Sequence, residues 1–168
     1  MNKKIRIGCA SGFWGDTDIA APQIIEKGNV DYLVCDYLSE VTMSILSRAK
    51  LKSSEHGYAK DFINHVGPLL KTIKQNKIKV ISNAGGVNLD ACKKALSNKA
   101  KKENINLKII TVEGDDLSGI QKDLQKMSIK EIDSGKSLPE NLLSINAYLG
   151  APGIKRALEQ EADIVITG

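Results

Sequence analysis

The chain has 168 residues and a formal net charge of +4, with 42% hydrophobic and 26% charged residues. This is the size and composition of one ordinary globular domain. Only 4% of the residues are aromatic, so aliphatic side chains must form the core, which favours α/β layering over an aromatic-cored sandwich. The lysines are not interleaved with aromatic residues, so we expect no nucleic-acid partner. No apolar run approaches the roughly 20 residues that span a bilayer, so we expect no membrane segment.

The three cysteines, Cys9, Cys35 and Cys92, are an odd number without a CxxC motif or a signal peptide. This pattern predicts a cytoplasmic protein with reduced thiols. Since the first two lie in apolar runs and Cys92 lies on an apolar helix face, we expect all three to pack in the core.

Short apolar runs predict six β-strands, at residues 4–10, 31–36, 78–82, 107–112, 143–149 and 163–167. The runs are continuous rather than alternating, which is typical of strands buried on both faces of a sheet. Helical patterns separate them, and this alternation predicts right-handed parallel crossovers. We therefore expect an α/β fold with a three-layer, doubly wound, mostly parallel, Rossmann-like sheet of about six strands. Part of a (β/α) barrel is the alternative.

The first predicted helices follow polar turns. Thr17 or Asp18 is the expected N-cap after the first strand, and Ser39 is the expected N-cap after the second. The helix after Ser39 is predicted to carry three apolar residues on one face, namely Val41, Ile45 and Ala49. Pro68 lies inside the helical pattern of residues 58–75, which predicts a kink or two abutting helices.

Two further helical patterns follow the third and fourth strands. The first begins at Asn88 with an inner stripe of Leu89, Cys92, Leu96 and Ala100. The second places Leu117, Ile120, Leu124 and Met127 on one face. Residues 128–141 are polar and are interpreted as a connection or an excursion. The chain stops at Gly168, directly after a strand, so we expect residues 1–168 to be a single α/β domain from the N-terminal part of a longer protein.

The turn from Ser11 to Asp18 is the first candidate site. It contains Gly12, Trp14, Gly15 and Asp16 before a predicted helix, an arrangement that presents backbone N–H groups to a phosphate or carboxylate. Its glycines do not form GxGxxG, so a dinucleotide fingerprint is not supported. The competing interpretation is a tight turn held by a buried Trp.

The second candidate is the turn from Asn83 to Asn88, where Gly85 and Gly86 let a ligand approach the backbone. Asn83 offers a hydrogen-bond donor and an acceptor, and no P-loop lysine follows. The alternative is a turn that needs a glycine with positive φ. A third feature is Asp36, which ends the second predicted strand about twenty residues after Gly15, where dinucleotide-binding folds carry an acid.

Carboxylates form the next candidate. Asp115 and Asp116, with Glu113, could hold Mg²⁺ or divide acid–base roles. Helix capping is the competing interpretation. The last candidate is Asn146 with Tyr148. A buried Asn needs partners, so Asn146 orients a substrate or ties to a neighbouring loop, and Tyr148 is an acid or a wall of the site.

Several motifs occur together in order, and they resemble the N-terminal domain of the acyclic terpene utilisation (AtuA-like) family. They are SGFWGD at residues 11–16, DYLV at 31–34, DYL at 36–38, SNAGG at 82–86, GDD at 114–116, NAYLGA at 146–151 and ADIVITG at 162–168. The resemblance covers nearly the whole chain. It implies a role in the catabolism of terpenoid or branched organic acids, often beside acyl-CoA enzymes, but it supplies no catalytic residue.

Two hypotheses follow. In the first, the chain is part of a catabolic enzyme acting on an acyl-CoA-type substrate or organic acid, by hydration or lyase chemistry. Its acid–base or metal groups are then Asp16, Asp36, Asp115 and Asp116. The substrate-orienting residues of this hypothesis are Asn83 and Asn146. In the second, a non-catalytic domain binds a nucleotide or CoA, or assembles with another protein. A CoA thioester and a divalent metal both remain open, as does a homo-oligomer, and the substrate is a small molecule.

Overall fold

The computed structural model describes residues 4–168. Its centre is an all-parallel, five-stranded sheet in the order β1-β2-β3-β5-β4. The strands are β1 (Ile7–Ser11), β2 (Tyr32–Cys35), β3 (Lys79–Ser82), β4 (Ile109–Val112) and β5 (Ile164–Thr167). This confirms the α/β class and the doubly wound, Rossmann-like arrangement, with five strands instead of six.

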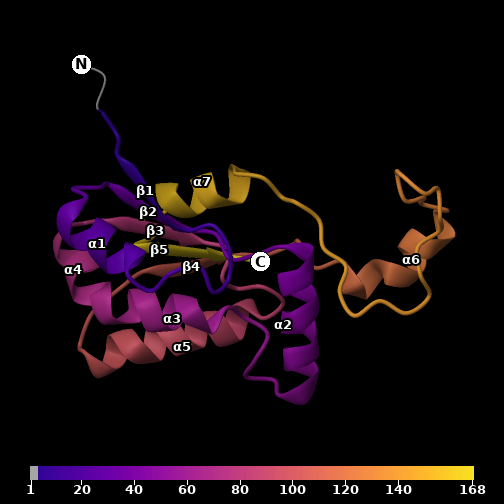
Figure 1. Ribbon diagram of the computed structural model, residues 1–168, viewed down its shortest axis with the longest axis horizontal. Helices are drawn as coiled ribbons and strands as arrows, with labels where there is room; N and C mark the ends of the chain where they lie inside the picture. Colours follow the sequence, from indigo (N-terminus) through magenta and orange to yellow (C-terminus); the bar gives the residue numbers. More distant parts are fainter. Residues whose placement is uncertain (1–3) are drawn as a thin grey trace.

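One face of the sheet is covered by a continuous layer of helices (Figure 1). This layer contains α1 (Ala20–Lys27), α3 (Lys60–Val66), η1 (Gly67–Leu69), α4 (Leu70–Gln75) and α5 (Leu89–Lys102). The large core lies beneath it, with Leu33, Phe62 and Ile164 fully buried. The break at η1 contains Pro68, as the sequence predicts. The predicted stripe on α5 is also confirmed, since Cys92, Leu96 and Ala100 are buried.

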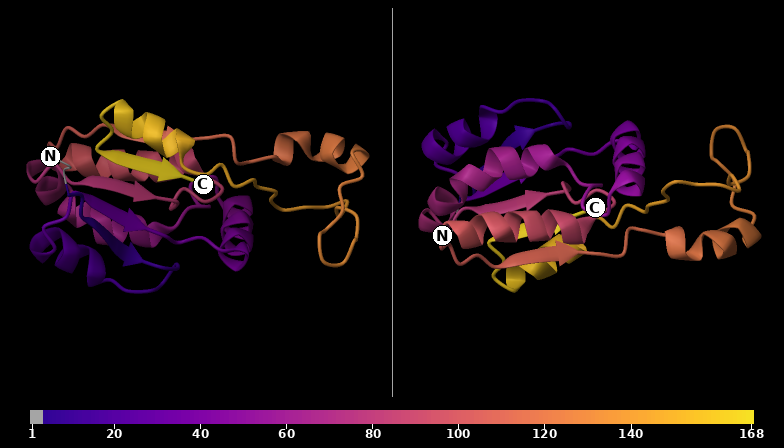
Figure 2. Two further views of the ribbon diagram at one scale, coloured as in Figure 1. Left: turned by 90° about the horizontal axis from the view of Figure 1, so that it is seen from above. Right: turned by 90° about the horizontal axis from the view of Figure 1, so that it is seen from below.

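Among residues 4–168, only α7 (Pro152–Glu159) lies on the opposite face, where it packs on β4 and β5. The small core there consists of Ala157, Ala162 and Val165 with their neighbours. In the left view of Figure 2 no helix lies over β1, β2 and β3. The third layer of the fold is therefore present over only one side of the sheet.

The helix α2 (Glu40–Lys52) stands beyond the carboxyl ends of the strands (Figure 1). Ser39 caps it by accepting from the Thr42 N–H, as predicted. The residues that α2 buries are Thr42, Leu46 and Ser47, whereas Val41 and Ile45 are exposed. The apolar face seen in the sequence therefore points to solvent.

Residues 113–151 leave the sheet as a long arm (Figures 1 and 2). The arm contains η2 (Ser118–Ile120) and α6 (Gln121–Lys126), neither of which has a buried residue. The predicted strand at 143–149 is wrong, because this run forms only an isolated antiparallel bridge between Asn146 and Asp116. β5 occupies the place between β3 and β4, so the run has no strand neighbour. The apolar composition of this run is the same as that of a buried strand, which is why the sequence pattern predicts one.

Two smaller expectations also differ from the structure. The helix α1 begins after Ile19 without a side-chain cap, and Thr17 instead accepts a hydrogen bond from the Ile19 N–H. Cys35 and Cys92 are buried as expected, but Cys9 is exposed because its face of β1 has no covering layer. Within residues 4–168 no helix is long and apolar enough to cross a membrane.

Candidate functional site

The carboxyl ends of the strands form a continuous rim of polar groups, which we call the carboxyl rim. At the end of β1, the Ser11 carbonyl accepts a hydrogen bond from the Asp36 N–H at 3.1 Å. The Asn83 side chain then donates to the Asp36 carboxylate at 2.6 Å and accepts from the Tyr37 N–H at 2.8 Å. These bonds join the ends of β1, β2 and β3, because all the strands run in the same direction.

The rim continues across β5 to β4. The Gly85 N–H donates to the Thr167 carbonyl at 3.0 Å. Gly168 lies between the Asp115 carboxylate and the Gly86 carbonyl, so closely that an added Cβ would collide with that carboxylate and lie 2.9 Å from the carbonyl oxygen. Asn146 donates to Asp115 at 2.8 Å from the arm. Residues distant in sequence are thus linked into one edge.

The rim contains two pairs of a carboxylate and a carboxamide. In the first, Asp36 is exposed and accepts through one oxygen from both Asn83 and the Leu38 N–H. In the second, Asp115 is only 7% exposed and accepts from Asn146. In each pair the second carboxylate oxygen has no hydrogen-bond partner among residues 4–168. Each asparagine therefore orients an acid that keeps one oxygen for another group.

A small buried polar cluster lies beside the first pair. Ser11 is 5% exposed, and its hydroxyl has no hydrogen-bond partner within the described chain. It lies close to Cys35 and Tyr37. Burial raises the pKa of the Cys35 thiol to about 12 and raises the pKa of Tyr37 above its usual range, so both are neutral at physiological pH. Sequence reasoning missed Cys35 and Tyr37 as neighbours of the site, although both stand at a strand end.

Other predicted site residues serve local structure. Asp16 accepts from the Gly12 N–H at 2.9 Å and so closes its own turn. Trp14 packs against the core, as the competing interpretation of this turn expects, and no atom lies near the Cβ position of Gly15. Asp116 accepts from the Ser118 N–H at 2.9 Å and so closes the turn before η2, which itself has no side-chain cap.

Tyr148 is 99% exposed and projects from the arm rather than onto the rim. No group of three or more His, Cys, Asp or Glu side chains within residues 4–168 is arranged to hold a metal ion. The divalent ion considered for Glu113, Asp115 and Asp116 therefore has no support from geometry, since each of these side chains has a different partner.

The glycine turn after β3 offers little to an anion. The Gly86 N–H donates to the Asn83 carbonyl, the Val87 N–H to the Gly57 carbonyl, and the Asn88 N–H to the Gly85 carbonyl. Gly86 has φ +54°, and a Cβ there would lie 2.8 Å from the Gly57 carbonyl oxygen, so a glycine is required for close packing. Since these N–H groups are already used, the turn is not an open phosphate cradle.

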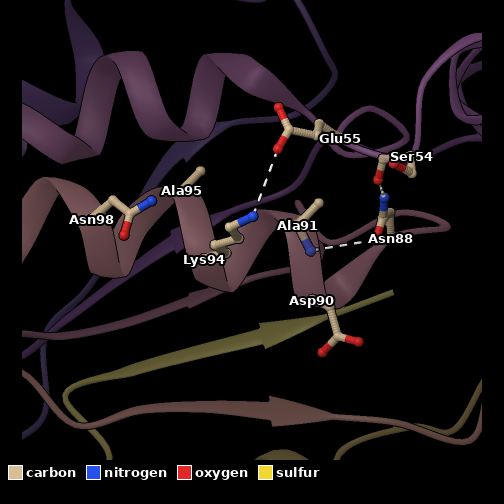
Figure 3. A pocket seen from close by; sticks show the side chains of 8 residues that line it. All are labelled: Ser54, Glu55, Asn88, Asp90, Ala91, Lys94, Ala95 and Asn98. Atoms are coloured by element: carbon tan, nitrogen blue, oxygen red, sulfur yellow. Dashed lines mark hydrogen bonds and ion pairs between the residues drawn. The ribbon is translucent and has the colours of Figure 1, made fainter.

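Two of the cavities are lined by residues other than those that form the rim. One of about 350 Å³ follows α5 and is shown in Figure 3. It is lined by Ser54, Glu55, Asn88, Asp90, Ala91, Lys94, Ala95 and Asn98. Lys94 pairs with Glu55 at 3.6 Å, and Asn88 caps α5 while donating to the Ser54 and His56 carbonyls. The polar groups of this groove are therefore mostly paired with one another.

The other cavity, of about 490 Å³, lies at the amino ends of the strands. Its lysines converge on Asp163, with Lys74 at 2.8 Å and Lys79 at 3.3 Å, and the Lys108 N–H donates to the same carboxylate at 2.9 Å. Burial raises the pKa of Asp163, but the hydrogen bonds from Lys74 and Lys108 outweigh it, so this pKa lies below its usual value. These charges hold elements of the fold together. We therefore place the candidate site at the carboxyl rim.

A family model described as acyclic terpene utilisation family protein AtuA matches residues 5–168. No curated protein and no solved structure matches the chain.

Proposed function

Because the chain belongs to the acyclic terpene utilisation family, we propose that its carboxyl rim is part of the active site of a catabolic enzyme for organic acids. The substrates are acyl-CoA-type esters or branched, terpenoid acids. The observation that carries the proposal is the repeated carboxylate–asparagine pair, Asp36 with Asn83 and Asp115 with Asn146.

The proposed chemistry is hydration or its reverse. One carboxylate takes a proton from water as the water oxygen bonds to one carbon of a C=C double bond in the substrate. The π bond breaks, and a proton is delivered to the other carbon. A carboxylate acts well in this role when it is held in one orientation and keeps an oxygen for the reacting group. Asp36 meets this condition in solvent, and Asp115 meets it in a largely buried position. Asn83 and Asn146 are positioning residues, because each acts through its acid.

Titration calorimetry of the chain with acyl-CoA esters and short branched acids tests the proposal, with and without Mg²⁺. We expect Asp36→Asn and Asp115→Asn each to weaken binding about tenfold or more, because an oriented charge is lost. Asp90→Asn is the matched control, since Asp90 lines the groove on α5. If only Asp90→Asn weakened binding, the site would lie in that groove and the rim would be excluded.

The alternative is a non-catalytic domain that binds a nucleotide or CoA. It is consistent with the local roles of Asp16 and Asp116, which accept backbone N–H hydrogen bonds within their own turns. It has less support, because the N–H groups of the glycine turn are already bonded within the protein. Metal-free nucleotide binding that survives both Asp36→Asn and Asp115→Asn would favour it.

A further inference from the structure

The part of the sheet without a helical layer is an apolar surface, which we call the bare face. It consists of Ile5, Ile7, Cys9, Tyr32 and Val34, and it borders on Ile81, which packs against the small core under α7. Strand register sets its rows, in which Ile7 pairs with Tyr32 and Cys9 with Val34, and Val34 in turn pairs with Ile81. The alternate residues of these strands, such as Leu33, are buried in the main core on the other face.

The bare face is exposed on β1, half-buried on β2 and almost uncharged. Ile7 is 67% exposed, and Cys9 beside it is also exposed. Lys79 is the only charged residue in these rows, and it is paired with Asp163. A parallel sheet normally has both faces covered, because its strands are apolar on both sides. This surface therefore lacks a layer.

The topology explains why the described chain does not cover it. The connections from β1 to β2, from β2 to β3 and from β3 to β4 all move in the same direction across the sheet, so right-handed crossovers place their helices on one face. Only the return from β4 to β5 places a helix, α7, on the other face. That helix lies over β4 and β5, away from β1.

The arm is a second exposed apolar surface, because its apolar side chains do not pack into a core. Its large apolar residues between 41% and 99% exposed are Ile120, Met127, Ile129, Ile132, Leu143, Tyr148 and Leu149. No residue from 116 to 150 is buried. Together these side chains expose on the order of 800 Å², which is one partner's share of a standard specific interface.

Beyond Asp116 the arm has no net charge, whereas its base adds three acids, Glu113, Asp115 and Asp116. Residues 117–150 contain four lysines (Lys122, Lys126, Lys130 and Lys136) and four acids (Asp123, Glu131, Asp133 and Glu140), which gives a net charge of zero. Because residues 117–150 have no net charge, net electrostatic repulsion does not oppose their contact with an almost uncharged surface.

From these two surfaces we infer that two copies of the chain exchange arms, so that the arm of each copy lies over the bare face of the other. A copy cannot cover its own bare face, because its arm starts from β4, at the opposite edge of the sheet from β1, and points beyond the carboxyl ends (Figure 1). Each copy offers one arm and one bare face, so a twofold axis closes the assembly with two equal contacts.

Sedimentation velocity with light scattering tests the exchange. We expect the wild-type chain at micromolar concentration to have twice its chain mass of 18.2 kDa. Ile7→Lys on the bare face and Ile132→Asp on the arm should each raise the dimer dissociation constant about 100-fold. Both residues are largely exposed in the single chain, so both variants should keep the wild-type circular dichroism and melting temperature at low concentration.

Ile19→Lys is the matched control, since Ile19 is 69% exposed but lies outside both surfaces. It should leave the dimer unchanged. A mixture of Ile7→Lys and Ile132→Asp should partly restore the dimer, because one of the two contacts then joins an intact arm to an intact bare face. A wild-type monomer at all concentrations would overturn the exchange. A dimer that is sensitive to Val41→Lys on α2 but to neither surface variant would also overturn it.

Discussion

The two carboxylate–asparagine pairs of the rim look alike but are held differently. Asp36 and Asn83 follow two adjacent strands, and Asn83 also accepts from the Tyr37 N–H, so the sheet itself fixes this pair. Asn146 lies on the arm, which has no buried residue between 116 and 150, so the second pair joins the sheet to a weakly supported segment. A substitution in the first pair should therefore change the stability of the whole fold. A substitution in the second pair should mainly change how firmly the arm is held.

The largest effect is expected from the sheet pair. Asn83→Ala removes the acceptor of the partly buried Tyr37 N–H and the donor to Asp36, and an unsatisfied buried donor is costly. We expect the free energy of unfolding to fall by about 2–3 kcal/mol, measured by urea denaturation. Asn83→Asp keeps the acceptor but places two carboxylates together at an exposed position, so its loss of stability should be smaller at high salt than at low salt. A loss of stability that does not change with salt concentration would contradict this geometry.

Asp163 provides a carboxylate at the other edge of the sheet whose role is structural. Asp163→Asn should lower stability by about 1–2 kcal/mol at pH 7, because charged hydrogen bonds from Lys74 and Lys79 are lost. The folded-state pKa of Asp163 is lowered, so its stabilising effect is present above the unfolded-state pKa of about 3.9 and disappears as the pH falls through the folded-state value. The difference in stability between the two proteins should therefore shrink progressively as the pH falls below the unfolded-state value. A difference that stays constant as the pH is lowered through this range would contradict the ion pairs.

The arm pair should behave in the opposite way to the sheet pair. Asn146→Ala removes one hydrogen bond to Asp115 at the base of the arm. We expect a global loss of about 1 kcal/mol or less, but clearly faster hydrogen exchange from residue 113 to residue 150, because local opening costs less there. Mass spectrometry of peptic fragments measures this. Equal acceleration across β2 and β3 would show that the two pairs are not independent.

The smallest effect is expected in the groove of Figure 3. Lys94 and Glu55 are exposed and lie 3.6 Å apart. Because exposed ion pairs contribute little, Lys94→Ala should change the free energy of unfolding by less than about 0.5 kcal/mol. A loss of 2 kcal/mol or more would mean that this groove is a structural centre that the geometry does not reveal.

Much of the fold follows from local pattern. Each observed strand overlaps a predicted apolar run, and Ser39, Pro68 and Asn88 act at the helix ends and the break where they were expected. The run at 143–149 misled the prediction, because composition records apolar character but not whether a neighbouring strand is available. The order β3-β5-β4 depends on contacts between distant residues, so a local pattern does not reveal it.

The sequence predicts where the candidate site lies, but it does not predict which of its residues are hydrogen-bonded to one another. Parallel topology brings strand ends together, so Asp36, Asn83 and Asp115 were expected on one edge. Their spacing in sequence does not reveal that Asn83 bonds to Asp36 or that Asn146 reaches Asp115. Tyr148 shows the limit most clearly, because it stands two residues from Asn146 and yet projects into solvent.

The most direct test is a ¹⁵N chemical-shift titration of the chain with an acyl-CoA ester and, separately, with a short branched carboxylic acid. The carboxyl rim predicts that the amide signals of Asp36, Gly85, Asp115 and Gly168 shift together and saturate at one ligand concentration. Shifts confined to the Asp90 and Lys94 groove or to the amino edge around Asp163, with an unchanged rim, would contradict the account.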